Sequence, residues 1–324
     1  MFNSKTRVAA ALCMAAAASP VLAQQYPSRP IHLIAAAAPG GSSDILARRL
    51  ATIIQEQTGA TVIVDNKGGG SGSIGLLAAA RAPADGYTVV IGNPDPVTIF
   101  PMSKKPRPYE LEKDLVTVAQ VAETHFVFAV SAKLPANNLS EFAAYVKARP
   151  GQLNYASAGN ATSGRLVTEM LKQKTGIELQ HVPYKSTAPA LQAVATGETA
   201  IMATSVTSMK ALMDSGLLKA IGIARESRLP TFRNIPTTSE GGLANFIVPV
   251  WMGIFSPPGI PEPIAEKLSA MFINAVNSED FKVQAATLGL DAKARGRAEF
   301  TKFLRADTKM WEETVRSANI SLED

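Results

Sequence analysis

The sequence predicts an α/β fold with two lobes, in which mainly parallel sheets are flanked by helices. Three short apolar segments, residues 31–35, 61–64 and 87–91, alternate with stretches whose apolar residues recur at helical spacing. This βαβ rhythm is typical of a parallel sheet. The same pattern of strand, turn and helix begins again at residue 153. The chain of 324 residues is also long enough to fold around two separate cores.

The first residues have the pattern of a secretion signal. Lys5 and Arg7 precede an apolar run at residues 8–18, and the small residues that follow suit cleavage after Ala23. The run is too short to cross a bilayer, which takes about 20 apolar residues. We therefore expect residues 1–23 to be a signal peptide and the mature protein to be exported and not membrane-embedded. Cys13, the only cysteine, lies in this segment, so the mature chain would have no disulfide and no cysteine metal site.

The first predicted strand ends at a turn of small residues, Pro-Gly-Gly-Ser-Ser-Asp at 39–44. Free peptide N–H groups at a helix start carry partial positive charge, and glycines without a Cβ let a ligand approach them. The turn could therefore hold a carboxylate or a phosphate. A tight turn capped by a serine would have the same sequence, so the turn alone leaves both interpretations open. The helix that follows is predicted from the spacing of Leu46, Leu50, Ile53 and Ile54.

A second glycine-rich loop follows the strand at residues 61–64. Gly70, Gly72 and Gly75 have the spacing of the dinucleotide-binding fingerprint and lie between a predicted strand and a predicted helix. The loop is longer than the tight turn of that motif, and the acidic residue expected about 20 residues later is Asp95, in a proline-rich loop. Nucleotide binding is therefore the weaker interpretation.

The remaining elements complete the two lobes. The second unit of strand, turn and helix has its strand at 153–157 and its turn at 158–163. Two helix starts of this kind, one in each lobe, would form a cleft suited to an anion. A surface loop is expected at 94–108, strands at 116–121, 126–130, 178–183, 200–204, 218–224 and 248–255, helices at 139–148, 189–196 and 208–215, and two closing helices around Leu268 and Trp311.

Several functions lack support in the sequence. The chain has 32 basic and 27 acidic residues without a basic block, which argues against nucleic acid binding. No nucleophile elbow, P-loop or paired-histidine zinc motif occurs. His32, His125 and His181 stand alone, so we expect no metal site. We also expect no cofactor and no enzymatic activity; the alternative is an exported α/β enzyme that uses Asp44.

A series of short motifs, all in one order, resembles a known family. They are Tyr-Pro-Ser-Arg-Pro-Ile at 26–31, Pro-Gly-Gly-x-x-Asp at 39–44, Asp-Asn-Lys-x-Gly at 65–69, Asp-Gly-Tyr-Thr at 85–88, Leu-Asn-Tyr-Ala-Ser at 153–157, His-Val-Pro-Tyr-Lys at 181–185 and Trp-x-Gly-x-Phe at 251–255. The resemblance extends from Tyr26 to Ile320. Over this range the chain is similar to the substrate-binding proteins of tripartite tricarboxylate transporters, also called the Bug family of periplasmic solute receptors.

The resemblance implies a type II-like periplasmic binding protein with its ligand cleft between the lobes. One lobe would consist of residues 24–124 and 249–324 and the other of residues 125–248, with the two crossings acting as a hinge. Such a protein closes on a small organic acid and delivers it to cognate membrane permease subunits; a monomer in the periplasm is expected here. A receptor that reports the same ligand to a membrane kinase is an alternative that the sequence does not separate.

The resemblance also implies which residues contact the ligand. A ligand carboxylate would be held by the turns at 39–44 and 158–163, mainly through peptide N–H groups, hydroxyl groups and ordered water. Asp44 would orient water or a ligand donor, or would only complement the helix dipole. The expected binding residues are Ala37, Pro39, Gly40, Gly41, Ser42, Ser43, Asp44, Ser157, Asn160, Ala161, Thr162, Ser163, Arg165 and Thr204.

Departures from the family pattern bear on the choice of ligand. The family usually has Pro-Phe where this chain has Ala36 and Ala37, so the cleft is expected to be wider there. Arg165 stands in place of the usual histidine, and Ala200 and Thr204 stand in place of acidic residues. These changes would favour a second anionic group if the side chains face the cleft. We therefore expect a dicarboxylate, and a bulky or aromatic one such as a benzene dicarboxylate is a candidate.

Overall fold

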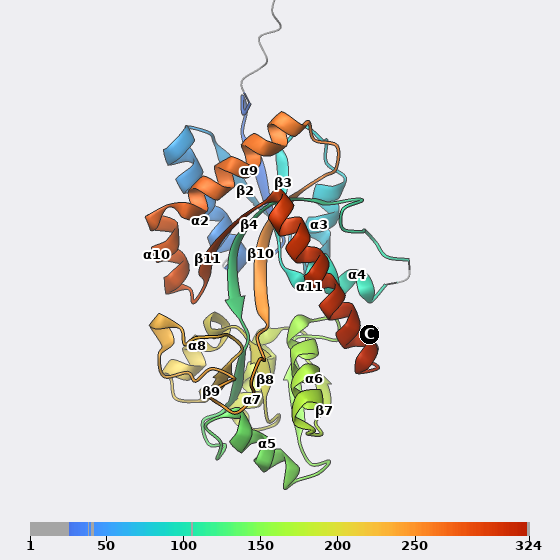
Figure 1. Cartoon of the computed structure of the whole chain (residues 1–324), viewed down its shortest axis with the longest axis vertical. Helices are drawn as coiled ribbons and strands as arrows, with labels where there is room; N and C mark the ends of the chain where they lie inside the picture. The colour runs from blue at the N-terminus through green and yellow to red at the C-terminus, as the bar shows by residue number, and fades with distance from the viewer. Residues whose placement is uncertain (1–25, 38, 40–41, 105, 323–324) are drawn as a thin grey trace, which may run out of the picture.

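The computed structural model describes residues 26–37, 39, 42–104 and 106–322, which form two lobes joined by long β-strands (Figure 1). The expected signal peptide and its cleavage site after Ala23 lie outside the described residues. Each lobe has its own sheet and its own buried apolar clusters. None of the helices within the described ranges is long and apolar enough to span a membrane.

The first lobe is built on a six-stranded sheet with the strand order β11-β4-β10-β3-β1-β2. Along β3, Val89 and Ile91 belong to the core that α2 and α9 cover, whereas Val90 belongs to the core that α3 and α11 cover. This alternation follows from the two-residue repeat of a strand and explains why both faces carry helices. The elements of this lobe are β1 (Ile31–Ala35), α2 (Ser42–Thr58), β2 (Val62–Asn66), η1 (Gly70–Gly72), α3 (Ser73–Ala80), β3 (Thr88–Gly92), η2 (Asp95–Ile99), α4 (Phe100–Met102), β4 (Val116–His125), β10 (Pro249–Ser256), α9 (Glu262–Asn277), α10 (Glu279–Thr287), β11 (Asp291–Gly296) and α11 (Arg297–Ser317).

The second lobe has a three-stranded sheet, β8-β5-β9, and a two-stranded sheet, β6-β7. A bridge between Tyr155 of β6 and Ile201, next to β8, joins the two sheets into one layer. The largest core side chains that this lobe itself contributes are Phe128, Phe142 and Tyr155, all fully buried. The elements of this lobe are β5 (Val127–Ser131), α5 (Leu139–Lys147), β6 (Asn154–Ser157), α6 (Ser163–Thr175), β7 (Gln180–Pro183), α7 (Thr187–Thr196), β8 (Met202–Thr204), α8 (Val206–Asp214), β9 (Leu218–Ile223) and η3 (Pro230–Phe232).

The two-lobed α/β fold expected from the sequence is confirmed, but its sheets are mixed rather than mainly parallel. β1 pairs in parallel with β2 and β3, and β6 pairs in parallel with β7. β10 pairs antiparallel with β3 and β4, and β5 pairs antiparallel with β8 and β9. Parallel neighbours need a crossover helix between them. β4, β5 and β10 belong to the segments that run directly from one lobe towards the other. They therefore need no crossover helix and can pair antiparallel with their neighbours.

The predicted repetition of strand, turn and helix is also present. The unit β1-α2-β2-α3-β3 of the first lobe has its counterpart in β6-α6-β7-α7-β8 of the second. In both units the first strand lies between the second and the third. In an α/β sheet the ligand site lies beyond the carboxyl ends of the parallel strands, where the helices start. The repeat therefore brings two such ends to the boundary between the lobes.

Three segments connect the lobes. β4 continues into β5 through Phe126, and the chain returns to the first lobe where β10 begins at Pro249. The third connection is α11, which starts beside β4 and ends next to α6 (Figure 1). Its residue Phe300 is buried in the first-lobe core, and its residue Trp311 is buried in the second-lobe core.

A buried carboxylate fixes α11 to β10. Asp307 of α11 is 6 % exposed, and its Oδ2 accepts hydrogen bonds from the indole nitrogens of Trp251 on β10 at 2.8 Å and Trp311 at 3.0 Å. Burial raises the pKa of Asp307 to about 6, although the two indole donors act in the opposite direction. Both tryptophans of the chain therefore share one acceptor at the junction of the lobes.

Candidate ligand-binding cleft

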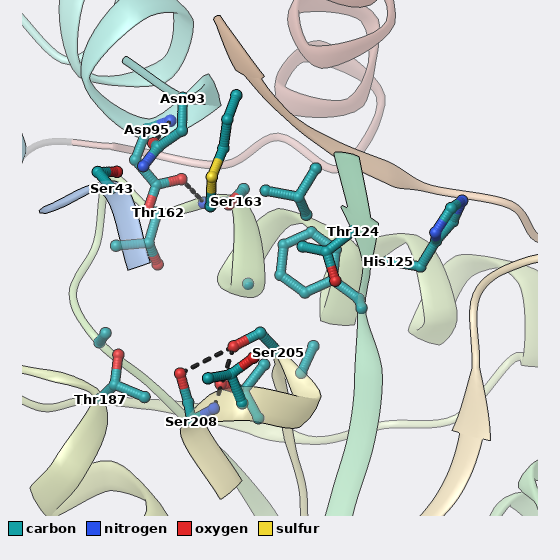
Figure 2. A pocket seen from close by; sticks show the side chains of 18 of the residues that line it. Ser43, Asn93, Asp95, Thr124, His125, Thr162, Ser163, Thr187, Ser205 and Ser208 are labelled. Atoms are coloured by element: carbon teal, nitrogen blue, oxygen red, sulfur yellow. Dashed lines mark hydrogen bonds between the residues drawn. The ribbon is translucent and has the colours of Figure 1, made fainter. Parts of the chain in front are cut away.

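A cavity of about 270 Å³ lies between the lobes (Figure 2). The first lobe contributes residues that follow β1 and β3 together with side chains of β4 and β10, and the second lobe contributes the starts of α6, α7 and α8. Polar residues predominate where these helices begin. The polar lining residues are Ser43, Asn93, Asp95, Thr124, His125, Thr162, Ser163, Thr187, Thr204, Ser205, Thr207 and Ser208.

Helix starts form the polar part of the wall. Thr162 has the extended backbone of an N-cap residue, and its Oγ1 donates to the carbonyl of Gly159 at 2.9 Å, which closes the turn before α6. Ser205 caps α8, where its Oγ accepts from the N–H of Ser208 at 3.2 Å. The first peptide N–H groups of a helix have no partner within the helix and carry partial positive charge. Converging helix starts with hydroxyl side chains are suited to an anionic ligand.

The cavity lacks a positively charged side chain among its described lining residues, which include no lysine and no arginine. Its ionisable groups there are Asp95 and His125. Burial, and then the nearby charge of Arg225, lower the pKa of His125 below its ordinary value, so this imidazole is neutral at pH 7. A ligand anion in this cavity would therefore be held by N–H and O–H groups rather than by an ion pair.

Of the expected binding residues in the first lobe, Ala37 and Ser43 line the cavity. Pro39 is exposed and does not line it. Gly40 and Gly41 lie outside the described residues, and so does the side chain of Ser42.

Asp44 is not among the residues that line the cavity. It is 3 % exposed, pairs with Arg48 at 2.9 Å and accepts from the side-chain amide of Asn66 at 2.9 Å. These contacts match the interpretation of Asp44 as a charge in the first turn of α2. They also engage the carboxylate on which the alternative of an exported enzyme depended.

In the second lobe, Thr162, Ser163 and Thr204 line the cavity. Ser157 does not line the cavity. Its Oγ forms a hydrogen bond with Nε2 of His181 at 2.6 Å and donates to the carbonyl of Gly159 at 2.9 Å, so it stabilises the turn at 158–163.

Two other residues of the second turn, Asn160 and Ala161, line a neighbouring cavity of about 220 Å³. That cavity also contains Lys104 and Lys185, and it shares Ala158 and Thr162 with the cleft. The second turn therefore separates two hollows rather than facing only one.

Arg165, which was expected to favour a second anionic group, lies away from the cavity lining. Its Nη1 donates to the carbonyl of Asn160 at 3.0 Å and to the carbonyl of Ser321 at 2.7 Å. The guanidinium thus ties the turn before α6 to the C-terminal segment. The condition that Arg165 should face the cleft is not met, because Arg165 does not line the cavity and its Nη1 donates within the protein. Thr204 does line the cavity.

Sequence reasoning missed several lining residues. Asn93 and Asp95 follow the end of β3, Ser205 follows the end of β8, and Thr187 begins α7. All of them lie where a strand ends or a helix begins. Applying the rule on carboxyl ends to every strand, and not only to the glycine turns, would have found Asn93, Asp95 and Ser205.

The glycines of the dinucleotide-like motif have structural explanations. Gly72 has a φ of 91°, and Gly70 has a φ of 53°, values that favour glycine. A Cβ on Gly75 would lie 2.9 Å from the Cα of Ala36, so this glycine lets α3 pack against the end of β1. Packing and backbone conformation thus account for the spacing that resembled a nucleotide site. Within the described ranges, no group of three or more histidine, cysteine or acidic residues is arranged to hold a metal ion.

Comparisons with known proteins agree with this architecture. The sequence model of a protein family, the tripartite tricarboxylate transporter family receptor, matches residues 46–320 of this chain. Among the similar proteins is the protein BugT of Bordetella pertussis, which is 31% identical over 320 residues that cover 96% of this chain and 96% of that protein.

Two solved structures are similar along most of the chain. One, of R. palustris Rpa4515 with adipate, has a TM-score of 0.82 at 27% identity and covers 91% of this chain and 99% of that one. The other, of the periplasmic binding protein BugD, has a TM-score of 0.78 at 29% identity and covers 92% of this chain and 100% of that one. This chain therefore belongs to the tripartite tricarboxylate transporter receptor family of periplasmic solute-binding proteins.

Proposed function

We propose that this protein captures a small organic acid in the cleft between its lobes and delivers it to the membrane permease of a tripartite tricarboxylate-type transporter. The observation that carries the proposal is the convergence of the starts of α2, α6, α7 and α8 on one cavity that has no lysine or arginine in its described lining. Peptide N–H groups and hydroxyl groups are the donors that such a wall offers to a carboxylate. The adipate bound to the similar protein Rpa4515 supports a carboxylate ligand.

The proposed ligand contacts are Ser43 from the first lobe and Thr162, Ser163 and Thr204 from the second. The turn at 39–42 is expected to add peptide N–H groups. We further propose that residues 24–124 with 249–324 form one moving unit and residues 125–248 the other. Closing of these units around the acid, with release at the permease, is the mode of action that a cleft between hinged lobes favours.

A thermal-shift screen of residues 24–324 tests the proposal. The panel contains aliphatic and aromatic mono-, di- and tricarboxylates together with nucleotides. A ligand that binds only the folded state stabilises it by about 2.7 kcal/mol at one hundred times its dissociation constant. We expect at least one class of acid to raise the melting temperature. A response to nucleotides and to no acid would contradict the proposal.

The size of the ligand is predicted to depend on Ala37. This side chain lines the cavity, and a phenylalanine there would fill space that a bulky dicarboxylate needs. Ala37→Phe is therefore expected to weaken binding of benzene-1,4-dicarboxylate about tenfold or more in calorimetry. Ala37→Ser, which keeps the side chain small, serves as the control and should bind as the wild type does. Unchanged affinity in Ala37→Phe would show that the widened cleft has no part in the choice of ligand.

A further inference from the structure

Asp95 connects the two lobes inside the cleft. It is the first residue of η2, directly after β3 in the first lobe, and its Oδ1 accepts a hydrogen bond from the N–H of Ser163 at 2.9 Å. Ser163 is the first residue of α6 in the second lobe. The bond is visible in Figure 2, where Asp95 and Ser163 meet at one side of the cavity. Asn93 holds the same segment in place, because its Oδ1 accepts from the N–H of Asp95 at 3.1 Å.

This contact changes what the start of α6 offers to a ligand. The peptide N–H of Ser163 would be a natural donor for a ligand carboxylate, yet the carboxylate of Asp95 already uses it. A second carboxylate placed at the same point would meet a like charge and would find this donor occupied. This side of the cavity therefore presents an acceptor where helix geometry alone predicts donors.

When Asp95 is ionised, it has no counter-ion among the described lining residues of the cavity. The lining residues that the structure describes include no lysine or arginine, and His125 is neutral at pH 7 because of burial. Burial also raises the pKa of Asp95, and the bonds from Ser163 offset part of that rise. A carboxylate surrounded by protein is stable when a cation pairs with it. Since Asp95 lines the cavity, the ligand can supply that cation.

The opposite side of the cavity has the complementary character. Figure 2 shows Thr187, Ser205 and Ser208 there, at the starts of α7 and α8. The hydroxyl groups of Ser205 and Ser208 lie 2.9 Å apart, so they form a pair at the first turn of α8, where the Ser208 N–H is capped by Ser205. Hydroxyl and N–H donors of this kind bind a carboxylate without a charged side chain. The cavity thus has an acceptor at one side and donors at the other.

We propose that Asp95 selects a ligand with a protonated amine, which binds the Asp95 carboxylate, and with a carboxylate, which binds at the starts of α7 and α8. The preferred ligand class is an amino-carboxylic acid whose two charged ends are separated, and a dicarboxylate of the same length binds more weakly. This inference rests on the proposed function as a carboxylate receptor. It assigns to Asp95 the role of a specificity-determining residue.

Calorimetric titration with matched acids tests this assignment. The first pair is 6-aminohexanoate and adipate, and the second is 4-(aminomethyl)benzoate and benzene-1,4-dicarboxylate; each pair differs only in the far group. The wild type is expected to bind the amino member of at least one pair about tenfold or more tightly than the diacid. Asp95→Asn keeps an oxygen acceptor for Ser163 and removes the charge, so it is expected to abolish or reverse this preference.

The control is Asp214→Asn, which removes one negative charge at the exposed end of α8 outside the cleft. It should keep the wild-type preference. Tighter binding of the diacids by the wild type would overturn the role of Asp95 and leave the receptor function standing. An amino-acid preference that persists in Asp95→Asn would also overturn it. If neither member of any pair binds and no other carboxylate does, the proposed function itself fails, and the inference with it.

Discussion

Replacing Trp311 with alanine is expected to lower the free energy of unfolding by about 3–5 kcal/mol, the range for removing a large buried aromatic side chain. Trp311 is fully buried, belongs to the second-lobe core together with Leu166 and Val167, and donates to Asp307. Truncation leaves a cavity and removes one of the two indole donors of a buried carboxylate. Urea denaturation followed by circular dichroism measures the loss.

Trp311→Phe is the matched control, since it retains an aromatic ring and removes the N–H. A loss well below that of the alanine variant is expected for it. If the free energy of unfolding of Trp311→Ala lies within about 1 kcal/mol of the wild-type value, α11 does not contribute to the second-lobe core as described.

Asp307→Asn is expected to change how stability depends on pH. Burial raises the pKa of Asp307 to about 6, so between about pH 4 and about pH 6 the folded protein binds this proton more tightly than the unfolded chain. The stability that the proton contributes is therefore lost as the pH rises through this window. Asparagine keeps an oxygen acceptor for both indoles and has no charge to bury. From about pH 4 to about pH 8 the stability difference should move in favour of the variant by roughly 3 kcal/mol.

Urea denaturation at several pH values measures this difference, with Asp214→Asn as the control for an exposed carboxylate. Because Asp214 lies at the surface, its variant should follow the wild-type pH dependence. Parallel curves for Asp307→Asn and the wild type would contradict the raised pKa. The fluorescence of Trp251 and Trp311 gives a second readout of the protonation of Asp307, since both indoles donate to its carboxylate.

The internal repeat could be predicted because its signals are local. A short apolar strand, a turn of small residues and a helical period are all visible within about 20 residues, and both units show them. The positions of Thr162 and Ser163 at the start of α6 followed from the same pattern, and both line the cleft. Local sequence thus predicts which chain segments reach the boundary between the lobes.

Long-range contacts explain what the sequence did not reveal. β11 has the sequence Asp-Ala-Lys-Ala-Arg-Gly, which lacks a bulky apolar face, because it is the edge strand of its sheet. One of the acceptors of Arg165 is the carbonyl of Ser321, 156 residues away. Asp95 and Ser163 are 68 residues apart and meet only because the lobes do. Spacing rules within one segment contain no information on such pairs.

The placement of α11 limits how the lobes can move. Two strands alone would let one lobe both swing and twist relative to the other. A helix of 21 residues, about 30 Å long, with Phe300 fastened in one core and Trp311 in the other, works as a stiff strut. If the two connecting strands act as the proposed hinge, a helix fixed in both cores would oppose the twist more than the swing. Each closure would then bring the same residues of the two lobes together, so that a short-range hydrogen bond such as that between Asp95 and Ser163 can form again.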